Sequence, residues 1–87
     1  MRISMPFFCY ILYSEKLDKY YTGSCEDIFH RVEQHNTGRN LSTKSGTPWV
    51  LKYSEQFSNR SDATQREAGI KKKKSRKYIE WLINSAS

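Results

Sequence analysis

One short apolar stretch limits the folds open to this 87-residue chain more than any other feature. From Phe7 to Tyr13 every residue is aromatic, aliphatic or cysteine, which favours a β-strand. Alternate side chains of a strand point to opposite faces. The two sets are Phe8, Tyr10 and Leu12 on one face and Phe7, Cys9, Ile11 and Tyr13 on the other. Since both faces are apolar, each must be covered by other parts of the chain or carry a function.

Two further strands are expected. The polar residues 14–19 separate the first strand from Tyr20–Thr22, which favours an antiparallel hairpin that Gly23 would end. Trp49–Phe57 alternates again, with Trp49, Leu51 and Tyr53 on one face, and predicts the third strand.

Helices are expected in the remaining segments. Ser24, with Asp27 three residues later, resembles a capping box, and the helix would run to about Thr37, where Gly38 stops it. Its apolar stripe would be Ile28, Phe29 and Val32.

Ser61 would cap a second helix that continues into the basic run 71–77, and Ser75 would start a short third one. The third helix would dock through the pairs Tyr78 with Leu82 and Ile79 with Ile83, while Trp49 and Trp81 would be core residues. The order β-β-α-β-α-α predicts an α+β fold, a three-stranded antiparallel sheet flanked by helices. Residues 1–87 would form one domain with a core of about 6–83, and 1–5 and 84–87 would be flexible.

Charge narrows the partners. Lys and Arg exceed Asp and Glu by 15 to 9, and a net charge of +6 on a small domain favours polyanions such as nucleic acid. Cys9 and Cys25 have no zinc-ligand spacing and are too few for a disulfide scaffold, so reduced thiols in the cytoplasm are expected. The apolar run from Pro6 to Tyr13 is too short to cross a membrane.

A set of polar side chains stands out against this frame. Arg31 and His35 are four residues apart and would share one helix face, so both can point to one place. The hairpin would bring Tyr10 and Tyr21 side by side. Taken singly, each of these residues is more often a packing or surface residue.

In their order and spacing these residues resemble the GIY-YIG nuclease superfamily, in particular its small stand-alone bacterial members. The resemblance covers about residues 6–83. Phe8-Cys9-Tyr10 stands in place of the first tripeptide and keeps its tyrosine, and Tyr21-Thr22-Gly23 in place of the second keeps tyrosine and glycine. Arg31, His35 and Glu67 match the helix arginine, the histidine one turn later and the metal-binding glutamate. Ile79 stands where some relatives have asparagine.

The resemblance implies a phosphodiester hydrolase with the catalytic residues Tyr10, Tyr21, Arg31, His35 and Glu67. Glu67 would hold one Mg²⁺ or Mn²⁺ and Arg31 would stabilise charge on the scissile phosphate. Tyr10 and His35 are both candidates for the general base, and the sequence leaves this choice open. No small-molecule cofactor and no membrane partner are expected.

The implied substrate is nucleic acid, with DNA favoured and DNA repair or recombination as the setting. Further nucleic-acid contacts would come from Gly23, Arg39, Lys44, Lys71, Lys72 and Lys74. The alternative is a nucleic-acid-binding module of the same fold with feeble or no catalysis, to which a protein partner would deliver the substrate.

Overall fold

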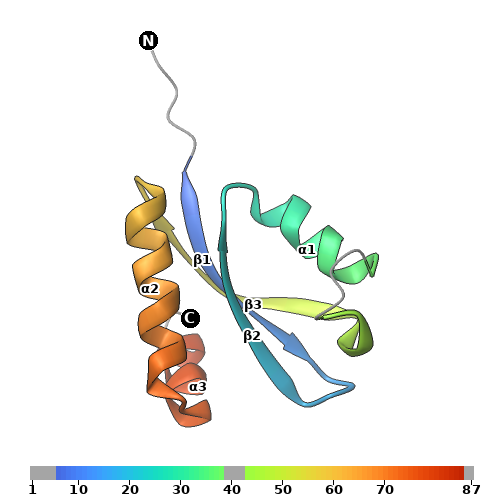
Figure 1. Ribbon diagram of the computed structural model, residues 1–87. Helices are drawn as coiled ribbons and strands as arrows, with labels where there is room; N and C mark the ends of the chain where they lie inside the picture. Colours follow the sequence, from blue (N-terminus) through green and yellow to red (C-terminus); the bar gives the residue numbers. More distant parts are fainter. Residues whose placement is uncertain (1–5, 39–42, 86–87) are drawn as a thin grey trace.

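The computed structural model describes residues 6–38 and 43–85, and within them the fold is α+β, as predicted. A three-stranded antiparallel sheet has the order β2-β1-β3 in this described part. Helix α1 covers one face of the sheet, and α2 and α3 cover the other (Figure 1). The elements are β1 (Phe7–Ser14), β2 (Lys19–Cys25), α1 (Ile28–Asn36), the 3₁₀ turn η1 (Lys44–Gly46), β3 (Trp49–Phe57), α2 (Arg60–Lys73) and α3 (Arg76–Ser85).

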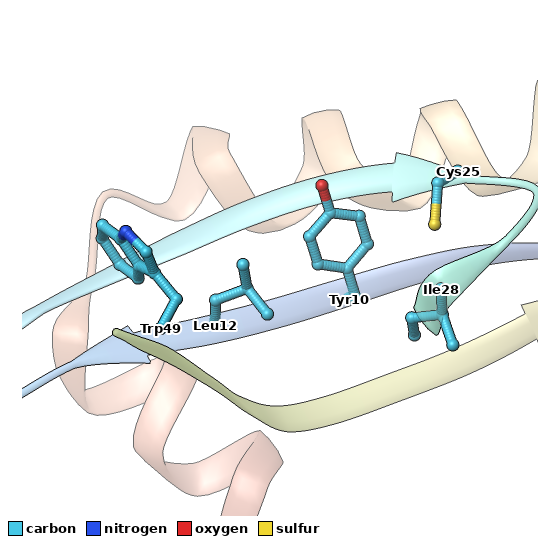
Figure 2. Packing of buried hydrophobic residues seen from close by; sticks show 5 residues of the cluster. All are labelled: Tyr10, Leu12, Cys25, Ile28 and Trp49. Carbon is cyan, nitrogen blue, oxygen red and sulfur yellow. The ribbon is translucent and has the colours of Figure 1, made fainter. Parts of the chain in front are cut away.

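The apolar strand β1 is the centre of the sheet, and both of its faces are buried. On the α1 side Figure 2 shows the Tyr10 ring between Leu12 and Cys25, with its hydroxyl directed toward β2. This cluster is completed by Ile28 and Trp49. On the other side Cys9 and Ile11 pack against Ile70 of α2 and Leu82 of α3. Cys9 and Cys25 are both free thiols, as expected.

The connection from β2 to α1 differs from the prediction. Gly23 does not end β2, because pairing with β1 continues through Ser24 opposite Cys9 and Cys25 opposite Phe8. Ser24 is therefore a strand residue, and Asp27 caps α1 by accepting a hydrogen bond from the backbone N–H of His30.

The end of α1 is as predicted. Thr37 is its C-cap, and Gly38 follows with φ +78°, a left-handed conformation that glycine adopts without the steric cost of a Cβ.

A β-bulge in β3 changes which face its side chains reach. Leu51 pairs with Leu12, but Tyr53, two residues later, pairs with the adjacent Ile11, so Lys52 is the extra residue. Leu51 consequently packs on the α1 side and Tyr53 on the α2 side. The prediction that both share one face was wrong.

Three helix details were also predicted wrongly. Asn59, not Ser61, caps α2 by accepting from the N–H of Asp62. Phe29 and Trp81 are 84% and 61% exposed and belong to no core. Ser75 does cap α3, and Ile79 and Ile83 pack on the core as expected.

The described chain reaches farther than expected at its C-terminal end. Asn84 and Ser85 lie in α3 and are not frayed, while residues 1–5 and 86–87 lie outside the described part. Within it, no helix combines the length and the apolar character needed to cross a bilayer.

Candidate active site

A buried hydrogen-bond chain begins at the centre of the sheet. The Tyr10 hydroxyl lies 3.1 Å from Nε2 of His35, and Nδ1 of His35 lies 2.7 Å from Oγ1 of Thr43. All three residues are at most 1% exposed. A neutral imidazole donates from one ring nitrogen and accepts at the other, so both hydroxyls can be satisfied at once. Trp49 closes the chain by donating from Nε1 to the Thr43 carbonyl.

Burial sets the charge of this chain. It raises the pKa of the Tyr10 phenol, an effect increased by Tyr21 and Glu67 and opposed by the positive charge of Arg31. Burial also lowers the pKa of His35, and Arg31 lowers it further. Both groups are therefore neutral at pH 7, which leaves His35 able to accept a proton from Tyr10.

The buried imidazole predicts how stability depends on pH. The unfolded chain binds a proton at His35 near pH 6.5, whereas the folded state binds it only at lower pH. Between these two pKa values the unfolded state holds more protons, so the free energy of unfolding falls as pH decreases through this window. Urea unfolding across this range should show the decrease in wild type and a smaller one in His35→Gln. His30→Gln is the control because His30 is exposed on the same helix, and an equal effect of the two variants would contradict the burial of His35.

Gly23 makes room for the Tyr10 ring. It pairs with Tyr10 across β1 and β2, and a Cβ at Gly23 would lie 2.5 Å from the Tyr10 hydroxyl oxygen and 2.7 Å from the ring carbon that bears it. Any side chain at this position must therefore displace Tyr10.

The two glycines Gly23 and Gly69 give a matched prediction. Gly23→Ala should lower the free energy of unfolding, because overpacking of about 1–3 kcal/mol exceeds the roughly 0.5–1 kcal/mol gained by removing a strand glycine. Gly69→Ala should raise it by about 0.5–1 kcal/mol, because Gly69 lies inside α2 with nothing within 4 Å of the added Cβ. Urea unfolding of both variants measures the difference. Equal shifts would show that Tyr10 does not fill the space at Gly23.

Tyr21 extends this cluster toward solvent. Its ring centroid lies 4.9 Å from that of His35 and 6.4 Å from that of Tyr10. Tyr21 is half-buried, and the Lys71 ammonium lies 6.0 Å from its ring centroid. The paired tyrosines expected from the hairpin are thus present, one buried and one facing solvent.

Glu67 reaches the same strand from the other face of the sheet. Ser24 of β2 donates from Oγ to Glu67 Oε1 at 2.7 Å, and Lys71 donates from Nζ to Oε2 at 2.6 Å. The Glu67 side chain is 20% exposed. Because β2 is an edge strand, α2 can present Glu67 beside it while Tyr10 lies under it.

Arg31 completes the group. It lines a cavity of about 290 Å³ together with Ser24, the residue that bonds Glu67. The charges of Arg31 and Glu67 both act on the pKa of Tyr10, in opposite directions. Along β2 the structure therefore brings together the five predicted residues Tyr10, Tyr21, Arg31, His35 and Glu67.

Two contacts in this group have no counterpart in the sequence prediction. Ser24 was expected to cap a helix and instead bonds Glu67. Thr43 lies between helix and strand and gave no periodic or motif signal, yet it holds His35.

The predicted basic contacts are dispersed. Lys71, Lys72 and Lys74 are exposed around the end of α2, and Lys44 is exposed on η1. Arg39 lies outside the described residues.

The donors suit a single hard cation. Among the described residues no group of three His, Cys, Asp or Glu side chains could hold a metal, so a protein cage is excluded there. Mg²⁺ is commonly bound by one or two carboxylates, with water and substrate phosphate oxygens completing its shell. The partly exposed Glu67 carboxylate fits this pattern, since its two oxygens offer about four lone-pair positions and two are used.

The whole described core matches a known family. Residues 6–79 match the GIY-YIG catalytic domain, and the chain belongs to this family of nuclease-type domains.

Its relatives include UPF0213 proteins. One from Streptococcus agalactiae is 35% identical over 72 residues, which cover 82% of this chain and 81% of that protein. One from Halobacterium salinarum is 42% identical over 53 residues, 60% of this chain and 69% of its own length. The solution NMR structure of the UPF0213 protein BH0048 from Bacillus halodurans superposes with a TM-score of 0.56 at 28% identity, covering 92% of this chain and 84% of that one.

Proposed function

We propose that this chain is a cytoplasmic nuclease that hydrolyses DNA phosphodiester bonds with one divalent metal ion bound at Glu67, as a step in DNA repair or recombination. The observation that carries the proposal is the neutral Tyr10–His35 pair on the same strand edge as Arg31 and Glu67. Packing alone has no need of a buried imidazole hydrogen-bonded to a buried phenol beside these two opposite charges.

The pair provides a route for the proton of the attacking water. Tyr21, which is half-buried, orients the water. Tyr10 accepts the water proton as it passes its own to His35 Nε2, 3.1 Å away. This relay avoids a free phenolate, which the raised pKa of Tyr10 makes costly.

Arg31 acts on the phosphate. Its guanidinium is charged at every working pH and offers parallel N–H donors to two non-bridging oxygens. Negative charge grows on these oxygens during attack, and a fixed cation in a partly enclosed cavity stabilises it.

Glu67 holds the ion, with Ser24 fixing the orientation of its carboxylate. When bound, the divalent ion supplies charge neutralisation at the phosphate and the leaving oxygen. Lys71 must move from Glu67 Oε2 or share it, because the ion needs a free lone pair there.

That ion pair also favours a second candidate function, a nucleic-acid-binding module with little catalysis. Lys71 already neutralises Glu67 at 2.6 Å, which weakens the attraction of the site for a cation. In this case Lys44, Lys71, Lys72 and Lys74 would bind phosphates and a protein partner would act on the nucleic acid.

A plasmid-nicking assay combined with a gel-shift assay separates the two functions. The nuclease proposal expects cleavage in Mg²⁺ or Mn²⁺ that stops when the ion is chelated, with binding retained. A gel shift with no cleavage under any of these conditions would leave the binding module, and neither binding nor cleavage would refute both.

A further inference from the structure

A cationic groove adjoins the candidate active site. It is a cavity of about 330 Å³ over β2 and the junction of α2 with α3. Its lining includes four cations, Lys19, Lys71, Lys74 and Arg76, and one acid, Asp18. Ile70 and Ile79 also line it. The groove thus combines a partly apolar lining with cationic side chains, and polyanions bind to such clusters of positive charge.

The four cations are not equivalent. Arg76 is held by Asp18 at 2.6 Å and Glu80 at 3.2 Å, and Lys71 is held by Glu67. Lys19 and Lys74 form no ion pair with any other residue in the described ranges 6–38 and 43–85. These two charges are therefore available to an external anion.

The groove continues the line of the site along β2. Lys71 belongs to both, because it lines the groove and bonds Glu67. From Lys19 to Ser24 the strand spans roughly 17 Å, several times the axial phosphate spacing of about 3.4 Å in one strand of a duplex. A backbone with a phosphate at Arg31 and Glu67 can thus reach Lys19 and Lys74 without leaving β2.

The basic run of α2 and α3 is consequently divided. Lys71 and Lys74, three residues apart, face the groove. Lys73 lies instead over the Tyr78 ring, 5.2 Å from its centroid, and neither it nor Lys77 lines the groove.

We propose that this groove is a phosphate-binding subsite that holds the cut nucleic-acid strand beside the scissile bond, with Lys19 and Lys74 as its phosphate ligands. This inference rests on the proposed nuclease function and assigns the course of the substrate along β2. A nucleic-acid backbone fits better than an acidic peptide, because the groove leads directly into the Arg31 and Glu67 pocket.

The test compares two variants that lose the same charge. Lys19→Gln/Lys74→Gln removes the groove cations, and Lys73→Gln/Lys77→Gln removes two cations of the same run outside it. Glutamine keeps most of the side chain and avoids adding glycine or alanine effects at Lys74, which has φ +48°. Circular dichroism and urea unfolding would establish that both variants are folded.

Binding is measured by fluorescence anisotropy with a fluorescein-labelled DNA duplex in chelator across a salt series. For the groove variant we expect the slope of log Kobs against log salt to fall in magnitude by about 1.4–1.8, since each lost phosphate contact removes about 0.7 to 0.9. In cleavage assays the same variant should raise KM with little change in kcat. The Lys73→Gln/Lys77→Gln variant should show smaller changes in both.

The failures of the two proposals can be told apart. Equal effects of the two variants, with wild type cleaving DNA, would overturn the groove subsite and leave the nuclease intact. A wild type that neither binds nor cleaves DNA would overturn the nuclease and the subsite together.

Discussion

Arg31→Ala lowers kcat/KM for DNA cleavage by about 100- to 1,000-fold, the loss expected when one preorganised charge-stabilising donor is removed. Arg31 shares a cavity with Ser24, and its charge acts on both members of the proton relay. The variant therefore loses phosphate stabilisation and also the opposing effect on the raised pKa of Tyr10. Arg31→Lys should recover only part of the rate, because an ammonium cannot make the two parallel bonds of a guanidinium.

Arg60→Ala is the matched control. Arg60 lines the same cavity but is exposed and paired with Glu26, so its removal takes away the same charge at a nearby position. Single-turnover cleavage at saturating DNA should show a change of only a few fold for Arg60→Ala. Comparable losses in the two variants would mean that general positive charge, and not the geometry at Arg31, drives cleavage.

Glu67→Gln abolishes most metal-dependent cleavage, with an expected loss of roughly 100-fold or more. The amide keeps the shape of the side chain and still accepts from Ser24, but it removes the charge that would bind the ion. DNA binding in chelator should stay or strengthen, because a negative charge beside the groove is lost. The lost pair with the exposed Lys71 should cost only a few tenths of a kcal/mol of stability.

Glu55→Gln provides the comparison. Glu55 is a half-buried glutamate of β3 that pairs with Arg66 at 3.1 Å and lies away from Ser24 and Arg31. Its replacement should leave the rate and the Mg²⁺ concentration for half-maximal cleavage within a few fold of wild type. If Glu67→Gln cleaved DNA as fast as Glu55→Gln, the ion would have to bind elsewhere.

The sheet could be predicted because its signals are local and strong. The all-apolar Phe7–Tyr13 run has room only in the middle of a sheet covered on both faces, and β1 is there. The alternation from Trp49 likewise gave β3, but not its bulge at Lys52, because that register depends on which residues of β1 lie opposite.

Helix starts were less predictable, since several adjacent residues satisfy the same local rule. Ser24 and Asp27 are both good N-caps. Pairing of Ser24 with Cys9 across the sheet, a contact distant in sequence, assigns Ser24 to the strand and leaves Asp27 to cap the helix. Trp81 was expected in the core because tryptophan is usually buried, but α3 uses Leu82 for that contact and leaves Trp81 on its outer side.

The candidate site divides in the same way. The spacing of Tyr10, Tyr21, Arg31 and His35 could be recognised along the chain, and their grouping beside Glu67 is what the structure adds. Ser24 and Thr43 could not be found from sequence, because each acts through one hydrogen bond to a partner on another element.

A sheet one layer thick, with separate clusters on its two sides, divides the evolutionary constraints on this small chain. Substitutions at Ile70 or Leu82 alter how much protein stays folded, while the environment of Tyr10 and His35 lies across β1 and is left intact. Effects of changes on the two sides should largely add when the residues share no partner. Lineages can therefore remodel α3, and with it whatever the exposed Trp81 contacts, without rebuilding the chemistry on the opposite side.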